Sequence, residues 1–372
     1  MAFRSSVIPF SKAYWDLELE GGGNLPPGPC FIYGNHSNNY DPFILNAFTE
    51  LGGATTGVMT MEYLRSGILS KIFSAAGIVG TQKRVPEPHL IRRIWRMLDE
   101  GRRVVIFPEG GRRWDGRPAP WIESTAKLFM RATVPVYPVE IIGSYVGWPR
   151  WASWPRPGHL KVKVHDAIDF SDQPDLEIGL DRLKKPIAVD ENVVSRSIRP
   201  AWAFRPADGI ARLLYRDPES GVFGGLRASR GNEVSNLPGT RRWRVQADST
   251  LVDMDTGIHT ISADLYDQIK NLPLPDSSAQ PILQGTANLR IASHLSEDRI
   301  LPNQTCTLWK DHLEFGDTHY INLEDVRYTG LERNDKLWLI SDSSTVFAHF
   351  RREDSVLAWK DVLDRLAPHT NQ

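Results

Sequence analysis

The sequence predicts an α/β protein: a layered domain with a central mixed sheet flanked by helices, and a smaller β-rich domain after it. Short apolar runs alternate with amphipathic stretches between residues 30 and 165, as in layered domains of alternating strands and helices. Many short alternating segments follow residue 281 and end in one amphipathic stretch, as in a small barrel or sandwich closed by a helix. With 372 residues, the chain is long enough for two or three domains.

The first predicted strand follows a turn cluster of proline and glycine at residues 25–29. Asp41 and Pro42 suit the N-cap and first position of a helix, and Gly77 and Gly101 suit the ends of two later helices. In chain order we predict strand 30–33, helix 42–51, strand 56–60, helix 66–76, helix 88–100, strand 103–107, helix 124–132, strand 134–142 and strand 159–165.

Beyond residue 190 the segments become shorter. We therefore predict a first domain over residues 1–190, a linker with a small ribbon-like segment over 191–280, and a β-rich domain with a C-terminal helix over 281–372. The predicted elements are a short helix 207–216, a strand pair within 241–254, strands 289–292, 304–308, 312–315, 320–323, 337–340 and 346–350, and a helix 353–366.

Composition narrows the functional classes. The formal net charge of −1 gives no overall attraction to nucleic acid or anionic lipid. Cys30 and Cys306 lie far apart and the histidines form no ligand pair, so we predict no disulfide framework, no metal and no bound cofactor. No run approaches the roughly 20 apolar residues that span a bilayer, and the N-terminus shows no signal-peptide core. We expect a cytoplasmic protein that associates peripherally with a membrane if its substrate is a lipid.

The strongest candidate for chemistry is Asn35-His36, followed five positions later by Asp41. A neutral histidine can take the proton of an alcohol near pH 7, and a carboxylate on the other ring nitrogen selects the tautomer and stabilises the imidazolium. An alcohol activated in this way can attack a thioester directly, without a serine nucleophile. Asp41 before Pro42 also fits a plain N-cap, so the pair alone leaves both interpretations open.

Three further segments follow in order: a loop ending in Lys83 and Arg84, the run Phe-Pro-Glu-Gly-Gly-Arg-Arg at 107–113, and Val-Pro-Val-Tyr-Pro-Val at 134–139. Together with His36 and Asp41, these blocks resemble the 1-acylglycerol-3-phosphate acyltransferase family and its wider lysophospholipid acyltransferase superfamily over residues 20–170. The resemblance implies transfer of a fatty acyl group from acyl-CoA or an acyl carrier protein to a lysophospholipid, with 1-acylglycerol-3-phosphate as the expected acceptor, in phospholipid biosynthesis or remodelling.

The resemblance also assigns roles to single residues. It makes His36 the general base and Asp41 its orienting partner, and it implies that the acceptor is bound by Glu109, Gly110, Arg112 and either Lys83 or Arg84. An arginine fork and glycine amides suit phosphate oxygens. Gly111 and Arg113 depart from the threonine and serine of many relatives, and an extra cation at Arg113 fits a phosphate.

Trp148, Trp151 and Trp154 alternate with prolines and arginines. Tryptophan beside arginine favours the headgroup level of a membrane, and an ordinary aromatic cluster that packs between domains is the alternative.

The second half shows a fainter resemblance. Some bacterial relatives follow the acyltransferase domain with a zinc-ribbon-like insert and a β-rich module, but here the ribbon cysteines are absent near Tyr215 and over 241–254. The last module then resembles a pleckstrin-homology-like barrel with its closing helix.

Two alternatives remain at this point. The chain could be a catalytically inactive lipid-binding or scaffold protein that retains the fold, or an acyltransferase for glycerol-3-phosphate or another acceptor such as an amino-acid lipid. The intact His36, Asp41 and Glu109 argue against the inactive protein.

Overall fold

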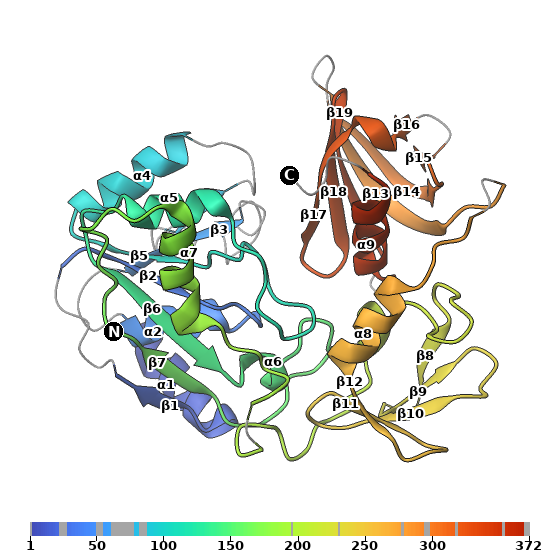
Figure 1. Ribbon diagram of the computed structural model, residues 1–372, viewed down its shortest axis with the longest axis horizontal. Helices are drawn as coiled ribbons and strands as arrows, with labels where there is room; N and C mark the ends of the chain where they lie inside the picture. The colour runs from blue at the N-terminus through green and yellow to red at the C-terminus, as the bar shows by residue number, and fades with distance from the viewer. Residues whose placement is uncertain are drawn as a thin grey trace. The chain divides into compact units, whose positions relative to one another are not determined.

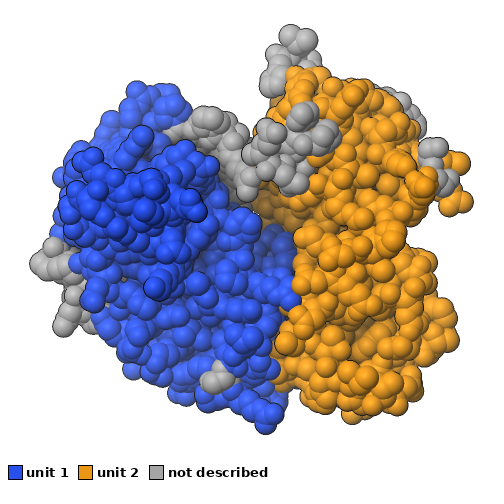
Figure 2. All heavy atoms as spheres, viewed as in Figure 1, with its two compact units in different colours: residues 1–150, 155–203 blue, residues 151–154, 204–372 orange. Residues whose placement is uncertain are grey.

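The computed structural model describes residues 2–21, 28–49, 55–60, 78–81, 88–194, 196–229, 231–276, 279–293, 298–316, 319–351 and 354–367. The chain divides into two compact units, coloured separately in Figure 2. Unit 1 comprises residues 1–150 and 155–203, and unit 2 comprises residues 151–154 and 204–372. None of the helices in the described ranges is long and apolar enough to cross a membrane.

Unit 1 is built on a seven-stranded mixed sheet with the strand order β1-β7-β6-β2-β5-β3-β4 (Figure 1). Its central strands β6, β2, β5 and β3 run parallel to one another, and only the β6–β7 pairing is antiparallel. The strands are β1 (Glu18–Glu20), β2 (Cys30–Gly34), β3 (Thr55–Thr60), β4 (Val79–Thr81), β5 (Arg103–Ile106), β6 (Val136–Ile142) and β7 (Lys161–Val164).

Apolar side chains bury both faces of this sheet. In β2, Cys30 and Ile32 enter one core cluster, and Phe31 and Tyr33 enter the other, because successive residues of a strand point to opposite faces. Helices on both faces explain why β2 is a continuous apolar run and not an alternating one. The helices of unit 1 are α1 (Ala2–Trp15), α2 (Asp41–Thr49), α4 (Pro88–Asp99), α5 (Glu123–Met130), α6 (Ser144–Gly147) and α7 (Leu176–Lys184), with the 3-10 turn η3 (Lys185–Ile187).

Unit 2 contains two antiparallel sheets. The first has the order β12-β11-β10-β9-β8 and is a meander, followed directly by helix α8 (Ser262–Asn271). The second has the order β16-β15-β14-β13-β19-β18-β17, and the closing helix α9 (Val356–Leu366) contacts β17 and β18 (Figure 1).

The strands of these two sheets are β8 (Leu226–Ser229), β9 (Glu233–Asn236), β10 (Arg242–Val245), β11 (Thr250–Asp253), β12 (His259–Ile261), β13 (Leu283–Ser293), β14 (Arg299–Leu308), β15 (His312–Phe315), β16 (His319–Asn322), β17 (Val326–Glu332), β18 (Lys336–Ser341) and β19 (Ser344–Phe350). The two remaining 3-10 turns of the described chain are η4 (Ile210–Arg212) and η5 (Leu323–Asp325).

The structure confirms a mixed α/β N-terminal part followed by a β-rich part. The predicted helix 207–216 is wrong: the segment holds only η4, because Gly209 adopts a left-handed conformation with φ of +92° and Arg216 forms a β-bridge with Phe223. Several elements were not predicted: helices α1, α6, α7 and α8 and strands β1, β4, β8, β9, β12 and β17. Pro9 lies inside α1. Because proline usually interrupts a helix, the sequence pattern did not predict this one. The predicted helix 66–76 lies outside the described residues.

Candidate active site

The sequence-predicted residues that the structure describes lie where β2 and β5 end. Because these strands are parallel neighbours, their carboxyl ends meet at one edge of the sheet, where α/β proteins form ligand sites. Asn35 continues β2 by using its side chain as a strand partner: Nδ2 donates to Ile141 O at 2.7 Å and Oδ1 accepts from Ile141 N at 2.8 Å. The amide of Arg113 donates to His36 O at 2.9 Å, which joins the two loops.

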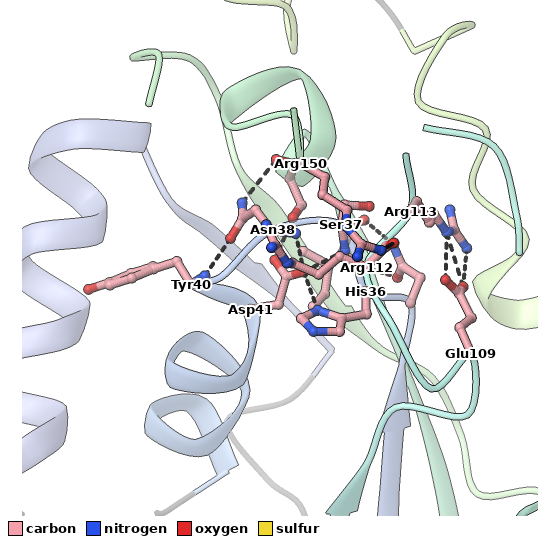
Figure 3. A network of polar contacts seen from close by, with 12 residues as sticks. His36, Ser37, Asn38, Tyr40, Asp41, Glu109, Arg112, Arg113 and Arg150 are labelled. Atoms are coloured by element: carbon pink, nitrogen blue, oxygen red, sulfur yellow. Dashed lines mark hydrogen bonds and ion pairs between the residues drawn. The ribbon is translucent and has the colours of Figure 1, made fainter. Parts of the chain in front are cut away.

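His36 and Asp41 are in direct contact (Figure 3). Nδ1 of His36 lies 3.0 Å from Oδ2 of Asp41, and the same oxygen accepts the amides of Ser37 at 2.7 Å and Asn38 at 2.9 Å. The Asp41 side chain is 2% exposed and the His36 side chain 16% exposed. With the Nδ1 proton donated to Asp41, Nε2 is the unprotonated nitrogen and can act as a base at a partly accessible position.

Phe107, the residue after β5, fixes the plane of the imidazole. The rings of His36 and Phe107 stack with centroids 4.4 Å apart and an interplanar angle of 28°. The ring is therefore restrained by a hydrogen bond at one edge and by an aromatic ring on one face. Such restraint keeps the base in one orientation, which is what proton transfer in a fixed geometry requires.

Glu109 and Arg113 form an ion pair in which both side chains are 1% exposed. Nε of Arg113 donates to both carboxylate oxygens at 3.0 Å, and Nη1 donates to Val189 O. Burial raises the pKa of Glu109, an effect that the Arg113 guanidinium opposes. The expectation that Arg113 adds a cation for a phosphate is wrong, because its guanidinium is directed into the protein toward Glu109. The contacts of Glu109 with Arg113 stabilise the loop that follows β5. The contact of Glu109 with an acceptor stays a prediction.

The neighbouring residues of this loop are also held by backbone contacts. The amide of Gly110 donates to Phe107 O at 3.0 Å, and the carbonyl of Arg112 accepts from Nη1 of Arg150 at 2.7 Å. The guanidinium of Arg150 lies over the ring of Trp114 at 4.2 Å from its centroid. Arg112 is half-buried and lies beside His36 in the polar network of Figure 3. Lys83 and Arg84 lie outside the described residues.

Two residues of this region were missed by sequence reasoning. Ser144 donates its hydroxyl to Oδ1 of Asp41, and the buried carboxylate of Glu191 accepts the amides of Gly143 and Ser144. Neither residue belongs to a motif that we singled out, and both lie more than 100 residues from Asp41 in the sequence. Only the paired strands β2 and β6 bring the segment after Ile142 next to the loop after Gly34.

Comparison with known proteins identifies relatives of this part of the chain. Residues 16–142 match the family model described as "Acyltransferase". A chloroplastic 1-acyl-sn-glycerol-3-phosphate acyltransferase of Brassica napus is 26% identical over 195 residues, which cover 51% of this chain and 54% of the relative. A 1-acyl-sn-glycerol-3-phosphate acyltransferase of Pseudomonas aeruginosa is 28% identical over 156 residues, which cover 41% of this chain and 58% of the relative. The chain thus spans little more than half of these relatives.

Among solved structures, the chain is similar to the 1-acyl-sn-glycerophosphate acyltransferase PlsC of Thermotoga maritima. The TM-score is 0.42 and the identity 20%, covering 50% of this chain and 76% of that chain.

Proposed function

We propose that the chain is an O-acyltransferase acting on a lysophospholipid, because its residues 16–142 match the acyltransferase family model and its relatives in this region include 1-acyl-sn-glycerol-3-phosphate acyltransferases. The resemblance to acyltransferases that the sequence motifs indicated is confirmed by these matches. The contact between Nδ1 of His36 and Oδ2 of Asp41 is the observation that carries the proposed activity, because it leaves the other ring nitrogen as the base.

The reaction follows from this geometry. Nε2 of His36 takes the proton from the acceptor hydroxyl, and the oxygen attacks the thioester carbonyl carbon. The carbon–sulfur bond then breaks, and the leaving thiolate takes the proton from the imidazolium. Asp41 stabilises the positive charge on His36 while it lasts. The donor in this proposal is acyl-CoA or an acyl carrier protein, and the acceptor is 1-acylglycerol-3-phosphate.

In this proposal the phosphate of the acceptor is bound beside the base by Arg112 and Gly110, with Lys83 or Arg84 as a further cation. Arginine suits this task because its planar fork donates two hydrogen bonds to phosphate oxygens. Glu109 takes part by holding Arg113 and thus the loop that carries Arg112.

An acceptor panel tests the proposed function. The purified full chain is incubated with radiolabelled acyl-CoA, or with acylated carrier protein, and one of several acceptors: 1-acylglycerol-3-phosphate, other lysophospholipids, glycerol-3-phosphate or an amino-acid lipid. We expect phosphatidate from 1-acylglycerol-3-phosphate, identified by mass spectrometry. Product from another acceptor alone would replace the proposed acceptor. Binding of lysolipid without product would favour the inactive scaffold.

We also propose that the protein contacts a membrane surface. The prediction that all three tryptophans of residues 148–154 face the membrane is wrong for Trp151. Trp151 is fully buried, so it belongs to the packed interior and not to a membrane-facing group. Trp154 is 47% exposed and packs edge-on against Phe204, itself 55% exposed, with ring centroids 5.5 Å apart. Exposed aromatic pairs of this kind suit the interfacial region of a bilayer.

The double variant Trp154→Ala/Phe204→Ala is expected to reduce co-sedimentation with vesicles of phosphatidylcholine and phosphatidate several-fold, because it removes the exposed aromatic pair. Tyr320→Ala is the matched control, since Tyr320 is equally exposed, at 55%, elsewhere in unit 2. Equal binding of both variants and the unchanged protein would remove this membrane contact.

For the last part of the chain, residues 281–372, we propose a pleckstrin-homology-like module. Seven antiparallel strands in the order β16-β15-β14-β13-β19-β18-β17, with one helix after the last strand, support this. Helix α9 covers the sheet with buried Val356, Trp359 and Leu363. The fold does not assign a ligand to the module. The three-part division at residues 190 and 280 likewise stays a proposal.

A further inference from the structure

Ser144, the first residue of α6, uses all of its polar groups in the candidate active site. Its hydroxyl donates to Oδ1 of Asp41, its carbonyl accepts from Nδ2 of Asn38 at 2.9 Å, and its amide donates to Oε1 of Glu191 at 3.2 Å. The residue is 1% exposed. The Ser144 hydroxyl therefore donates to Oδ1 of Asp41, whereas His36 and the amides of the 36–41 loop use Oδ2.

The chain reaches this position through a turn that requires glycine. Gly143 has a φ of +89°, and a Cβ added there would lie 2.1 Å from His159 O. The turn ends β6 and directs the next residue toward the loop that follows β2, the neighbouring strand. The placement of Ser144 is thus set by the sheet itself and by one sterically restricted backbone position.

Glu191 holds the turn from the other side. Its carboxylate is fully buried and accepts the amides of Gly143 at 2.9 Å and Ser144 at 3.2 Å, one on each oxygen. Burial raises the pKa of Glu191 to about 7, while the backbone amides and Arg113 lower it and Asp41 raises it. Burying this carboxylate near that of Asp41 destabilises the fold unless hydrogen bonds compensate, and the amides of Gly143 and Ser144 supply such bonds.

We propose that Ser144 is a positioning residue for the His36–Asp41 pair, and that Glu191 holds Ser144 in place. The inference rests on the proposed function. With Oδ1 hydrogen-bonded to Ser144 and Oδ2 to the amides of Ser37 and Asn38, the carboxylate cannot rotate about its Cβ–Cγ bond without losing hydrogen bonds. Oδ2 then stays aimed at Nδ1 of His36, which fixes the tautomer that leaves Nε2 basic.

Ser144→Ala tests the proposal, because alanine removes the hydroxyl, adds no volume and keeps the backbone bonds to Glu191 and Asn38. We expect kcat to fall about 10-fold, a modest share of the effect of a general base, with KM for both substrates within about twofold. Ser11→Ala is the matched control: this serine is also fully buried, and its hydroxyl donates only to Val7 O within α1. Thermal unfolding of each variant shows whether the fold is retained.

A double-mutant cycle separates positioning from general packing. In the Asp41→Asn background, Ser144→Ala should lower kcat by clearly less than 10-fold, because the carboxylate that the hydroxyl positions is no longer there. The same factor in both backgrounds would mean that Ser144 acts through something other than Asp41 and would overturn the proposal. Normal kcat in Ser144→Ala would overturn it as well.

A measurement without turnover distinguishes this inference from the proposed function. The hydrogen-bonded Nδ1 proton of His36 is followed by NMR, and its resonance is assigned by its loss in His36→Gln. We expect Ser144→Ala and Glu191→Gln to broaden or remove this resonance and Ser11→Ala to leave it unchanged. An unchanged resonance in Ser144→Ala overturns the positioning role, whereas a wild-type protein that shows the resonance but is inactive on every acceptor overturns only the proposed function.

Discussion

His36→Gln is expected to lower kcat for acyl transfer by about 100- to 10,000-fold, the range for loss of a positioned general base. Glutamine roughly fills the volume of the ring and can still donate toward Asp41, but it has no nitrogen that accepts a proton near neutral pH. Because the acceptor alcohol is then not deprotonated in the transition state, kcat falls while KM for the acceptor changes little.

The control for this variant is His165→Gln. His165 also lies beside a carboxylate, with Nε2 3.2 Å from Glu140, and belongs to the same unit. It is expected to keep normal kcat. Acyl transfer at a near-normal rate by His36→Gln would exclude His36 as the base and with it the proposed mechanism.

Asp41→Asn is expected to lower kcat by on the order of 100- to 10,000-fold, by analogy with the loss seen when the carboxylate of a histidine–aspartate pair is neutralised. The amide oxygen of asparagine can still accept the amides of Ser37 and Asn38, and its NH₂ can donate to the hydroxyl of Ser144, which can turn to accept. We therefore expect the fold to be kept and the loss to come from the missing negative charge beside the imidazolium.

Measurement of kcat together with the unfolding midpoint checks this prediction. Glu140→Gln, which neutralises the carboxylate beside His165, provides the matched change away from the site and is expected to leave kcat unaltered. If Asp41→Asn lost its activity only in proportion to lost folded protein, the aspartate would be a structural N-cap of α2 and not a partner of the base.

Local sequence patterns predicted most of the elements that position the site. Strand β2 and helix α4 follow from an apolar run after a turn cluster and from helical spacing closed by Gly101. The segments that local patterns did not reveal are those stabilised by distant contacts, such as α1 with its internal Pro9, which packs on α2. Tertiary burial outweighs local propensity in such segments.

By itself, the sequence indicated the resemblance to acyltransferases, the alternation of strands and helices, and the pairing of His36 with Asp41, because all three depend on residue types at short, fixed spacings. The tertiary structure decided that Arg113 is buried against Glu109 and that Trp151 is buried. It also decided that Ser144 donates a hydrogen bond to Asp41 and that Glu191 accepts the amide of Gly143, the residue before Ser144. These facts depend on which strands lie side by side and on which side chains lose contact with water. No local spacing encodes either property, because both depend on contacts between segments far apart in the sequence, as where the pairing of β2 with β6 brings Ser144 next to Asp41.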